Sequence, residues 1–475
     1  MLAKLSIRTL LSSYHNNRLF IIIIVVGVAS TIFFLINNLL LPYLFHNHIS
    51  AAYIKAVPTA GGPTFSDPNL KAEIIFKGLH IPTSMAFLGP SDILVLEKNT
   101  GNVIRIVNGK MLGPPLLHVN VATEVERGLL GIAIQKSANN HVPTYIFLYY
   151  TGTGIGSAGG SNTATGNHLY RYELINNQLV NPKLLLNLPA IPADPTSQET
   201  NHNGGKVVIG HDGNVYTIIG DVGSHRGQAE NIANGTPLDG TGGVLRVTQD
   251  GQPVANPPLE NVAGGTQEKG NSDMSKYYYA YGIRNSFGLG IDPVTGKLWD
   301  TENGPSFGDE INVIDPGFNS GWPKVQGIWQ AGGESSKPGP VAPLPPNNLV
   351  DFGGKGKYRS PEFSWLAPVA PTAITFLNSS KLGNQYQNTM FVGDVLTGNL
   401  YNFKLNPERT GLVLNGPLAN KVATTQAEMQ QGGIVLGKGF GLITDLQVGP
   451  DGYLYVLGYD GTVYRIVSSS SLASR

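Results

Sequence analysis

The stretch Val207-Val-Ile-Gly-His-Asp-Gly-Asn-Val-Tyr-Thr-Ile-Ile219 places two apolar runs on either side of an Asp-Gly pair. β-Branched and aromatic residues favour strands, and Asp-Gly between such runs is a strong signal for a tight hairpin turn. The same arrangement returns near the C-terminus in Leu446-Gln-Val-Gly-Pro-Asp-Gly-Tyr-Leu-Tyr-Val-Leu457. Each stretch therefore predicts two antiparallel strands joined by a short turn.

Looser copies of this strand–turn–strand pattern run along most of the chain. The six approximate copies are Ser84–Ile106, Leu129–Tyr150, Val207–Gly220, Leu289–Asp300, Ile374–Phe403 and Asp445–Ile466. Each copy needs neighbours to bury its faces, so the copies are expected to stack side by side. We expect an all-β fold, a six-bladed β-propeller of four-stranded antiparallel blades. A pair of β-sandwiches is the alternative.

The composition agrees with short strands and excludes several functions. The 475 residues include 60 glycines and 32 prolines, which supply many turns. The formal net charge is zero, so the chain lacks the basic footprint of a nucleic-acid partner. Cysteine is absent, which excludes disulfides, thiolate metal sites and thiol catalysis.

An uncharged apolar segment near the N-terminus predicts a single-pass membrane anchor. No charged residue occurs from Leu19 to Phe45, and a span needs about 20 apolar residues. Basic residues precede this segment, which places the N-terminus in the cytoplasm and the C-terminal domain in the extracellular or periplasmic space. A signal peptide cleaved near Ala51-Ala52 is the alternative. The expected parts are a cytoplasmic N-terminus (1–18), a transmembrane helix (19–45), a linker (46–70), the propeller (71–467) and a C-terminal tail (468–475).

Four short motifs at the ends of expected strands carry the candidate chemistry. They are Asn201-His-Asn-Gly-Gly-Lys206, Tyr281-Gly-Ile-Arg-Asn285, Glu302-Asn-Gly-Pro305 with Gly308-Asp-Glu-Ile-Asn312, and Asn319-Ser-Gly-Trp-Pro323. Loops held by a rigid scaffold are where binding and catalytic residues concentrate. The motifs therefore predict one polar site at strand ends.

The residue types in these motifs suit proton transfer and the binding of a polar ligand. The His202 imidazole is the usual kind of proton acceptor near neutral pH. The Arg284 guanidinium can bind carboxylates through two donors, and Asn285 can both donate and accept. Carboxylates and turn carbonyls near Glu302 are the hard oxygens that calcium prefers. The alternatives are a solvated histidine, an arginine that is paired between blades, and ordinary turn chemistry.

Together with Glu126-Arg-Gly-Leu-Leu-Gly-Ile-Ala133 and Gly220-Asp221, these motifs resemble the pyrroloquinoline quinone-dependent glucose/sorbosone (aldose sugar) dehydrogenase family over about Ala72 to Val467. The resemblance implies a six-bladed propeller with the quinone over the mouth of its channel, held partly by calcium. It also implies oxidation of the anomeric hydroxyl of aldose sugars, or of similar polyols, by hydride transfer to that quinone. The electrons would then pass to an unidentified acceptor.

The resemblance assigns roles to individual residues. It makes His202 the base that takes the hydroxyl proton, and it makes Arg284 the residue that polarises the accepting carbonyl. It places further cofactor contacts at Glu126, Arg284, Asn285 and Thr372, and calcium ligands at the backbone carbonyls of Gly304 and Pro305.

The chain departs from the family pattern where cations usually meet the quinone's carboxylates. The segment Leu442-Ile-Thr-Asp445 stands where relatives often have Arg-x-Arg-Asp, and no lysine stands at Thr397-Gly398. Glu126 replaces the usual glutamine, and Lys404 or Lys438 are the substitutes that the sequence offers. Loss of these cations favours a second function, a non-catalytic cell-surface propeller that binds carbohydrate or protein. A calcium-dependent lactonase-type hydrolase is a third alternative.

Overall fold

The computed structural model describes residues 58–137, 143–154, 163–193, 199–260, 262, 273–333 and 337–469. The expected anchor at 19–45 lies outside these residues. Among the residues that are described, no helix is long and apolar enough to cross a membrane. On that finding, the prediction of a single-pass cell-membrane protein is wrong for the described part of the chain.

The two Asp-Gly stretches form the hairpins that the sequence predicts. β12 (Val207–Ile209) pairs antiparallel with β13 (Val215–Ile219), so that Val207 lies opposite Thr217. The turn between them needs a left-handed residue, and Gly213 supplies it with a φ of 76°. β30 (Ile443–Val448) and β31 (Leu454–Gly458) repeat the arrangement near the C-terminus.

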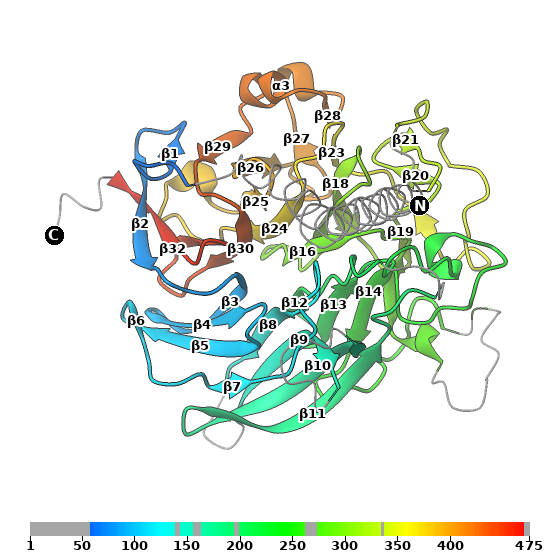
Figure 1. The fold of residues 1–475 in the computed structure, drawn as a ribbon. Coiled ribbons are helices and arrows are strands. Elements are labelled where there is room, and N and C mark those ends of the chain that lie inside the picture. The colour runs from blue at the N-terminus through cyan, green and yellow to red at the C-terminus, as the bar shows by residue number, and fades with distance from the viewer. Residues whose placement is uncertain are drawn as a thin grey trace, which may run out of the picture. The chain divides into compact units, whose positions relative to one another are not determined.

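The strands form seven sheets in the described chain (Figure 1). The first sheet contains β3 (Pro82–Gly89), β4 (Asp92–Glu97), β5 (Asn102–Val107), β6 (Lys110–Met111) and β7 (Leu117–His118). The second contains β8 (Leu129–Gln135), β9 (Thr144–Thr153), β10 (Ala164–Ile175) and β11 (Gln178–Leu188). The third contains β12, β13, β14 (Gly243–Val247), β15 (Tyr278–Tyr281), β19 (Phe318–Asn319) and β22 (Lys357–Tyr358).

The next three sheets continue around the propeller. The fourth contains β16 (Ser286–Ile291), β17 (Leu298–Glu302), β18 (Asp309–Ile314), β23 (Phe363–Trp365) and β28 (Val422–Ala423). The fifth contains β24 (Pro371–Phe376), β25 (Met390–Asp394), β26 (Leu400–Leu405), β27 (Leu412–Val413), β29 (Val435–Lys438) and β1 (Thr64–Phe65). The sixth contains β30, β31, β32 (Val463–Ser468) and β2 (Leu70–Phe76). The small seventh sheet pairs β20 (Val325–Gln326) with β21 (Trp329–Gln330). The helical segments are short: η3 (Gln228–Glu230), η4 (Met274–Lys276), η5 (Asn384–Tyr386), η6 (Gly416–Leu418) and α3 (Gln426–Gln431).

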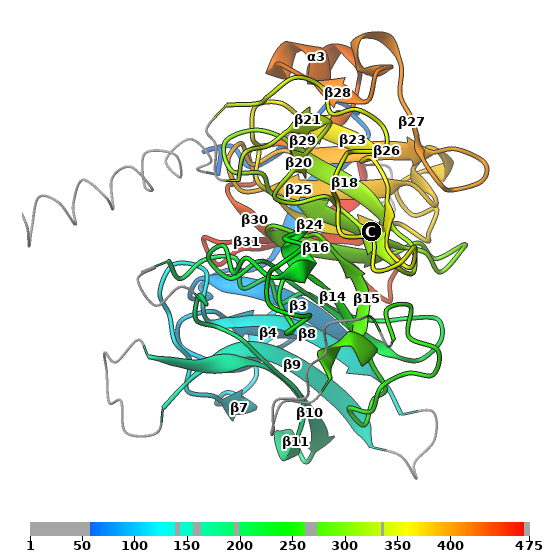
Figure 2. The ribbon, with the colours of Figure 1, turned by 90° about the vertical axis from the view of Figure 1, so that its right-hand side faces the viewer.

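The first strands of the larger sheets surround a central channel. Consecutive contacts join β3, β8, β12, β16, β24 and β30, and β30 returns to β3. Successive strands of a sheet then lie farther from the axis, as β8, β9, β10 and β11 do in Figures 1 and 2. The channel holds a cavity of about 470 Å³ lined by all of these first strands. The prediction of an all-β propeller is therefore confirmed.

The predicted make-up of the blades is wrong in its detail. The described strands form seven sheets of two to six strands instead of six sheets of four. Three pairings are parallel, namely β15 with β19, β19 with β22, and β23 with β28. These extra strands are only two or three residues long, and they come from the long loops, which add backbone hydrogen bonds at outer sheet edges.

The two ends of the described chain meet in one sheet. β2 pairs antiparallel with β32, so that Leu70 lies opposite Ser468. The pairing completes the last sheet with a strand from the start of the described chain, which ties the first and last sheets together. The closure fixes the channel mouth at which the site is built.

We expect Gly131→Ala to destabilise the propeller because Gly131 in β8 touches the loop that carries His202. A Cβ at Gly131 would overlap the carbonyl oxygen of Gly205, and backbone cannot swing aside as a side chain can. Overpacking of this kind costs about 1–3 kcal/mol. Urea unfolding should show the loss in the free energy of unfolding. Gly61→Ala is the matched control, since no atom lies within 4 Å of its added Cβ. Equal stability of the two variants would contradict this packing.

Candidate functional site

Loops beside three sheets meet at one mouth of the channel. Glu126 precedes β8, His202 precedes β12, and Arg284 with Asn285 precedes β16, while Asp221 follows β13. The innermost strand of each of these sheets starts at this mouth, and the second strand ends there. Residues just before an innermost strand and just after a second strand are therefore brought together, although they are distant in the sequence. The structure brings four of the predicted site residues together: Glu126, His202, Arg284 and Asn285.

Gly220 is the point where the loops cross. A Cβ on this residue would lie 2.7 Å from the His202 carbonyl oxygen and would also overlap the Arg284 carbonyl oxygen. The Asp221 amide donates to that Arg284 carbonyl at 2.8 Å. A glycine here therefore lets the histidine loop and the arginine loop approach each other closely.

His202 is held by a buried carboxylate. Its Nδ1 lies 2.6 Å from Oδ1 of Asp221, and the side chains are 3% and 0% exposed. The described residues make no hydrogen bond to Nε2, so this nitrogen is open to a ligand. Burial lowers the pKa of His202, but the charge and hydrogen bond of Asp221 outweigh burial and the nearby Arg284, and the net pKa is raised.

Trp322 and Arg284 complete the surroundings of this pair. The Trp322 indole donates to Oδ2 of Asp221 at 2.7 Å, which fixes the carboxylate from its other side. The Arg284 guanidinium lies over the Trp322 ring, 5.3 Å from its centroid. Burial raises the pKa of Asp221, but His202 and Arg284 favour its charged form and the net pKa is lowered. Asp221 is therefore held as a carboxylate.

Glu126 links the histidine to the Arg-Asn pair. Its carboxylate accepts from the backbone N–H of His202 and, at 3.1 Å, from Nδ2 of Asn285. The Oδ1 atom of Asn285 is buried and has no hydrogen-bond partner in the described chain. Since a buried unpaired oxygen is costly, this atom is a candidate contact for a ligand that donates or for a cation.

The predicted calcium carbonyls lie beside Arg284. Its Nη1 donates to the carbonyls of Asn303 at 3.1 Å and Gly304 at 3.2 Å, while Asp309 accepts from the Gly304 amide at 2.9 Å. Pro305 follows in the same turn. Among the described residues there is no group of three or more His, Asp or Glu side chains placed to hold a metal ion. Any cation here would depend on neutral oxygens and on a ligand's own charge.

No hydrogen bond of the described structure joins Thr372 to the His202 cluster. Its hydroxyl donates to the carbonyl of Ile443 at 2.5 Å and lies 3.4 Å from that of Gly393, which ties β24 to its neighbours. The predicted substitute cations are also elsewhere. Lys404 on β26 and Lys438 on β29 are exposed on outer strands.

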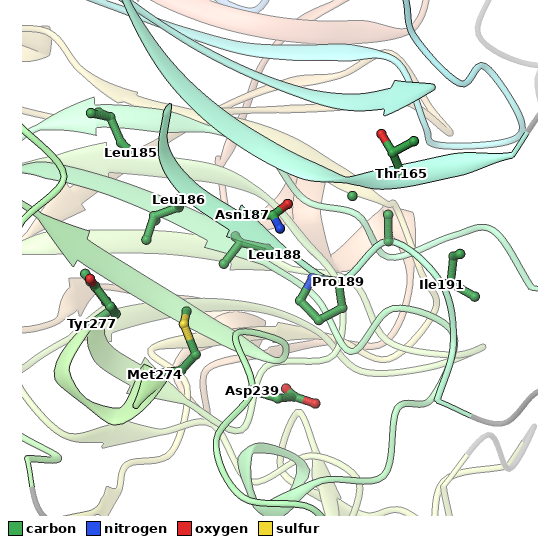
Figure 3. A pocket seen from close by; sticks show the side chains of 12 residues that line it. Thr165, Leu185, Leu186, Asn187, Leu188, Pro189, Ile191, Asp239, Met274 and Tyr277 are labelled. Atoms are coloured by element: carbon green, nitrogen blue, oxygen red, sulfur yellow. The ribbon is translucent and has the colours of Figure 1, made fainter. Parts of the chain in front are cut away.

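A second cavity, whose lining includes no residue of the His202 cluster, lies beside β10 and β11 (Figure 3). It has a volume of about 650 Å³ and is lined by residues of β10, β11 and the segment after β11, with Met274 of η4 and Tyr277 directly after η4. Asp239 is its one charged lining residue. A pocket without a cation does not suit an anionic cofactor, so the site at His202 is the better candidate.

Fold and site together define a β-propeller whose channel mouth carries a buried histidine–carboxylate pair beside an Arg-Asn pair. The family model for glucose/sorbosone dehydrogenase matches residues 79–465 of this chain. The chain belongs to the glucose/sorbosone dehydrogenase family.

Individual relatives support that membership. Aldose sugar dehydrogenase YliI of Escherichia coli is 25% identical over 389 residues, which cover 82% of this chain and 90% of the relative. Quinoprotein glucose dehydrogenase B of Acinetobacter calcoaceticus is 29% identical over 283 residues, which cover 54% and 53%. A crystal structure from Thermus thermophilus, described as an oxidoreductase (glucose dehydrogenase), is 26% identical with a TM-score of 0.59, covering 84% of this chain and 100% of that one.

Three residues at the mouth were not assigned roles from the sequence. Asp221 bonds the His202 ring, Trp322 bonds Asp221, and Lys98 lies buried near Glu126. Asp221 and Trp322 belong to quoted motifs, Gly220-Asp221 and Gly-Trp-Pro323, but 101 positions separate them. Besides the Gly220-Asp221 motif, the available signal for Asp221 was a carboxylate two residues after an apolar strand.

Asp221→Asn should lower the pKa of His202. The folded-state pKa of His202 is raised from 6.5, so the charged pair stabilises the fold fully below about pH 6.5. This contribution is lost as the pH rises through the raised value. Loss of the Asp221 charge should shift the imidazole titration, followed by NMR, to lower pH. The free energy of unfolding should also depend less on pH between about 6.5 and the raised pKa of His202.

Asp212→Asn is the control for this titration because Asp212 lies in the exposed turn after β12. The titration of His202 should not change in this variant. An unchanged pKa of His202 in Asp221→Asn would show that the pair does not set the charge of the imidazole.

Proposed function

We propose that this protein oxidises the anomeric hydroxyl of aldose sugars, or of similar polyols, by hydride transfer to bound pyrroloquinoline quinone. The observation that carries the proposal is the His202 imidazole, held at Nδ1 by Asp221 and open at Nε2. A sugar dehydrogenase must take a proton from the hydroxyl that it oxidises, and this geometry provides the acceptor.

His202 would accept the hydroxyl proton at Nε2. The buried Asp221 carboxylate keeps the imidazole in the tautomer that has its proton on Nδ1, and it stabilises the imidazolium that forms. Trp322 restrains Asp221, so the ring cannot turn away. The chain thereby prepares one oriented base in a site that is largely shielded from water.

The residues at the mouth fit an anionic quinone. Arg284 brings a permanent positive charge, and the unpartnered Oδ1 of Asn285 together with its Nδ2 offers both an acceptor and a donor. The quinone, when bound, would supply the acceptor for two electrons, and the protein would supply orientation and charge. Arg284 would polarise the accepting carbonyl. Because the electrons must leave again, the reaction also needs an external acceptor.

The oxygens near Gly304 fit calcium in a limited way. The carbonyls of Gly304 and Pro305 and the unpartnered, buried Oδ1 of Asn303 are hard neutral donors, and Gly304 already accepts from Arg284. Neutral donors alone bind calcium weakly, so the cofactor's carboxylates would have to supply the charge.

The other two functions receive less support. A lactonase-type hydrolase would need several carboxylates arranged about a metal, and no such group occurs in the described residues. A non-catalytic propeller would have no use for a buried, oriented imidazole, and burying it with Asp221 is costly unless the pair serves a purpose.

His202→Gln should abolish most of the turnover of the quinone-loaded protein. A positioned base contributes about 10²–10⁴-fold, so kcat should fall by that factor in a dye-linked assay with a panel of aldoses. His211→Ala is the matched control because His211 lies exposed in the turn after β12 and should keep full activity. Full turnover in His202→Gln would refute the base, and no sugar oxidation by loaded wild-type protein would refute the function.

Calcium should bind tightly when the quinone is present and weakly when it is absent. The protein donors near Gly304 are uncharged, so calcium alone should raise Tm little, whereas quinone and calcium together should raise it several degrees further. Magnesium is the control, since it demands a stricter octahedral geometry. A large shift with calcium alone would point to a carboxylate site elsewhere.

A further inference from the structure

Lys98 is a buried ammonium group that no carboxylate bonds. It follows β4, is 8% exposed, and its Nζ donates to Oδ1 of Asn99 at 3.0 Å and to the Thr123 carbonyl at 3.3 Å. Both acceptors are neutral, and an ammonium has three protons to donate. Burial lowers the pKa of Lys98 to about 8, although Glu126 raises it. A buried charge without a counter-charge is costly unless it serves a ligand.

Contacts connect Lys98 to the site. The Leu129 amide donates to the Lys98 carbonyl at 2.9 Å, and a Cβ on Gly128 would lie 2.5 Å from Cγ of Lys98. The loop from Thr123 to Leu129 thus wraps around this side chain. The same loop carries Glu126, whose carboxylate bonds the His202 amide and Asn285.

The topology also places Lys98 at this mouth. It comes directly after the second strand of its sheet, β4, just as Asp221 comes shortly after the second strand of another sheet, β13. Second strands end at the mouth where the His202 pair is found. Lys98 therefore approaches the site from a sheet whose other residues have no assigned role in it.

The other lysines do not offer the same charge. Two lysines of the described chain are buried, Lys98 and Lys206. The Lys206 ammonium bonds the buried Asp445 carboxylate, which also accepts from the Met85 amide at 2.8 Å. At Thr397, where a lysine is expected from the family, the hydroxyl and the amide both bond Asp394. Lys98 is thus the buried lysine whose charge is left for a ligand.

We propose that Lys98 receives a carboxylate of the bound quinone and replaces the cations missing near Thr397 and Leu442. The inference rests on the proposed function and names a residue that the motifs do not include. Asn99 and the Thr123 carbonyl hold the ammonium near the site, and the third proton of Lys98 bonds the incoming anion. When no quinone is bound, the buried charge of Lys98 has only neutral hydrogen-bond partners, which lowers the free energy of unfolding.

The test compares quinone affinity and stability in the same variants. The apoprotein is titrated with pyrroloquinoline quinone while tryptophan fluorescence is recorded, since Trp322 lies in the site. Lys98→Gln should weaken binding about ten- to hundredfold, and Lys98→Arg should stay within a few fold of wild type. The exposed Lys110→Gln in the same sheet is the matched control and should bind normally.

Stability separates this role from a merely structural one. Without quinone, Lys98→Gln should unfold at the same temperature as wild type or higher, because a desolvated charge has been removed. Lys98→Met, which keeps the apolar stem, replaces it if the glutamine variant does not fold. Equal quinone affinity in wild type and these neutral variants would overturn the inference.

The proposed function can fail separately. If wild type binds quinone and Lys98→Gln does not, but no sugar is oxidised, the role of Lys98 stands and the sugar dehydrogenase does not. If wild type does not bind quinone at micromolar concentration, both are overturned.

Discussion

The buried pair of His202 and Asp221 is the interaction on which the site depends. Asp221 is fully buried and His202 nearly so, and two ionisable groups removed from water are stable only when they are paired and hydrogen-bonded. The structure meets this demand from separate loops: Trp322 bonds the carboxylate, and Glu126 bonds the histidine amide. Removing any one partner leaves a charge or a donor without compensation, so the loops must be placed together.

The propeller makes this placement possible. Its first strands surround one channel, and the loops before them start at one mouth. The ring is closed by pairing β2 with β32, across almost the whole described chain. Lys206 adds a second tie, since its bond to Asp445 joins β30 to the start of β12. The site is therefore held by contacts that are distant in sequence.

Local patterns predicted the propeller and the His202, Arg284 and Asn285 motifs, and the family resemblance added Glu126. Neither predicted the pairings between distant residues. The Asp-Gly hairpins gave β12 with β13 and β30 with β31, because their signals lie within about a dozen residues. The strands β19, β22 and β28 are two residues long and have no period that a pattern could reveal. The bond between Asp221 and Trp322 and the burial of Lys98 depend on tertiary contacts. The prediction of a single-pass cell-membrane protein is wrong for the described residues, none of which forms a helix long and apolar enough to cross a membrane.

A crystal structure of the protein soaked with pyrroloquinoline quinone and calcium tests the central claim most directly. The account predicts difference density for the quinone at the channel mouth, in contact with Arg284, Asn285 and the ammonium of Lys98. Nε2 of His202 should face the open side of the ligand, and a calcium peak should lie against the carbonyls near Gly304. Quinone density in the pocket of Figure 3, with none at the mouth, would contradict the account.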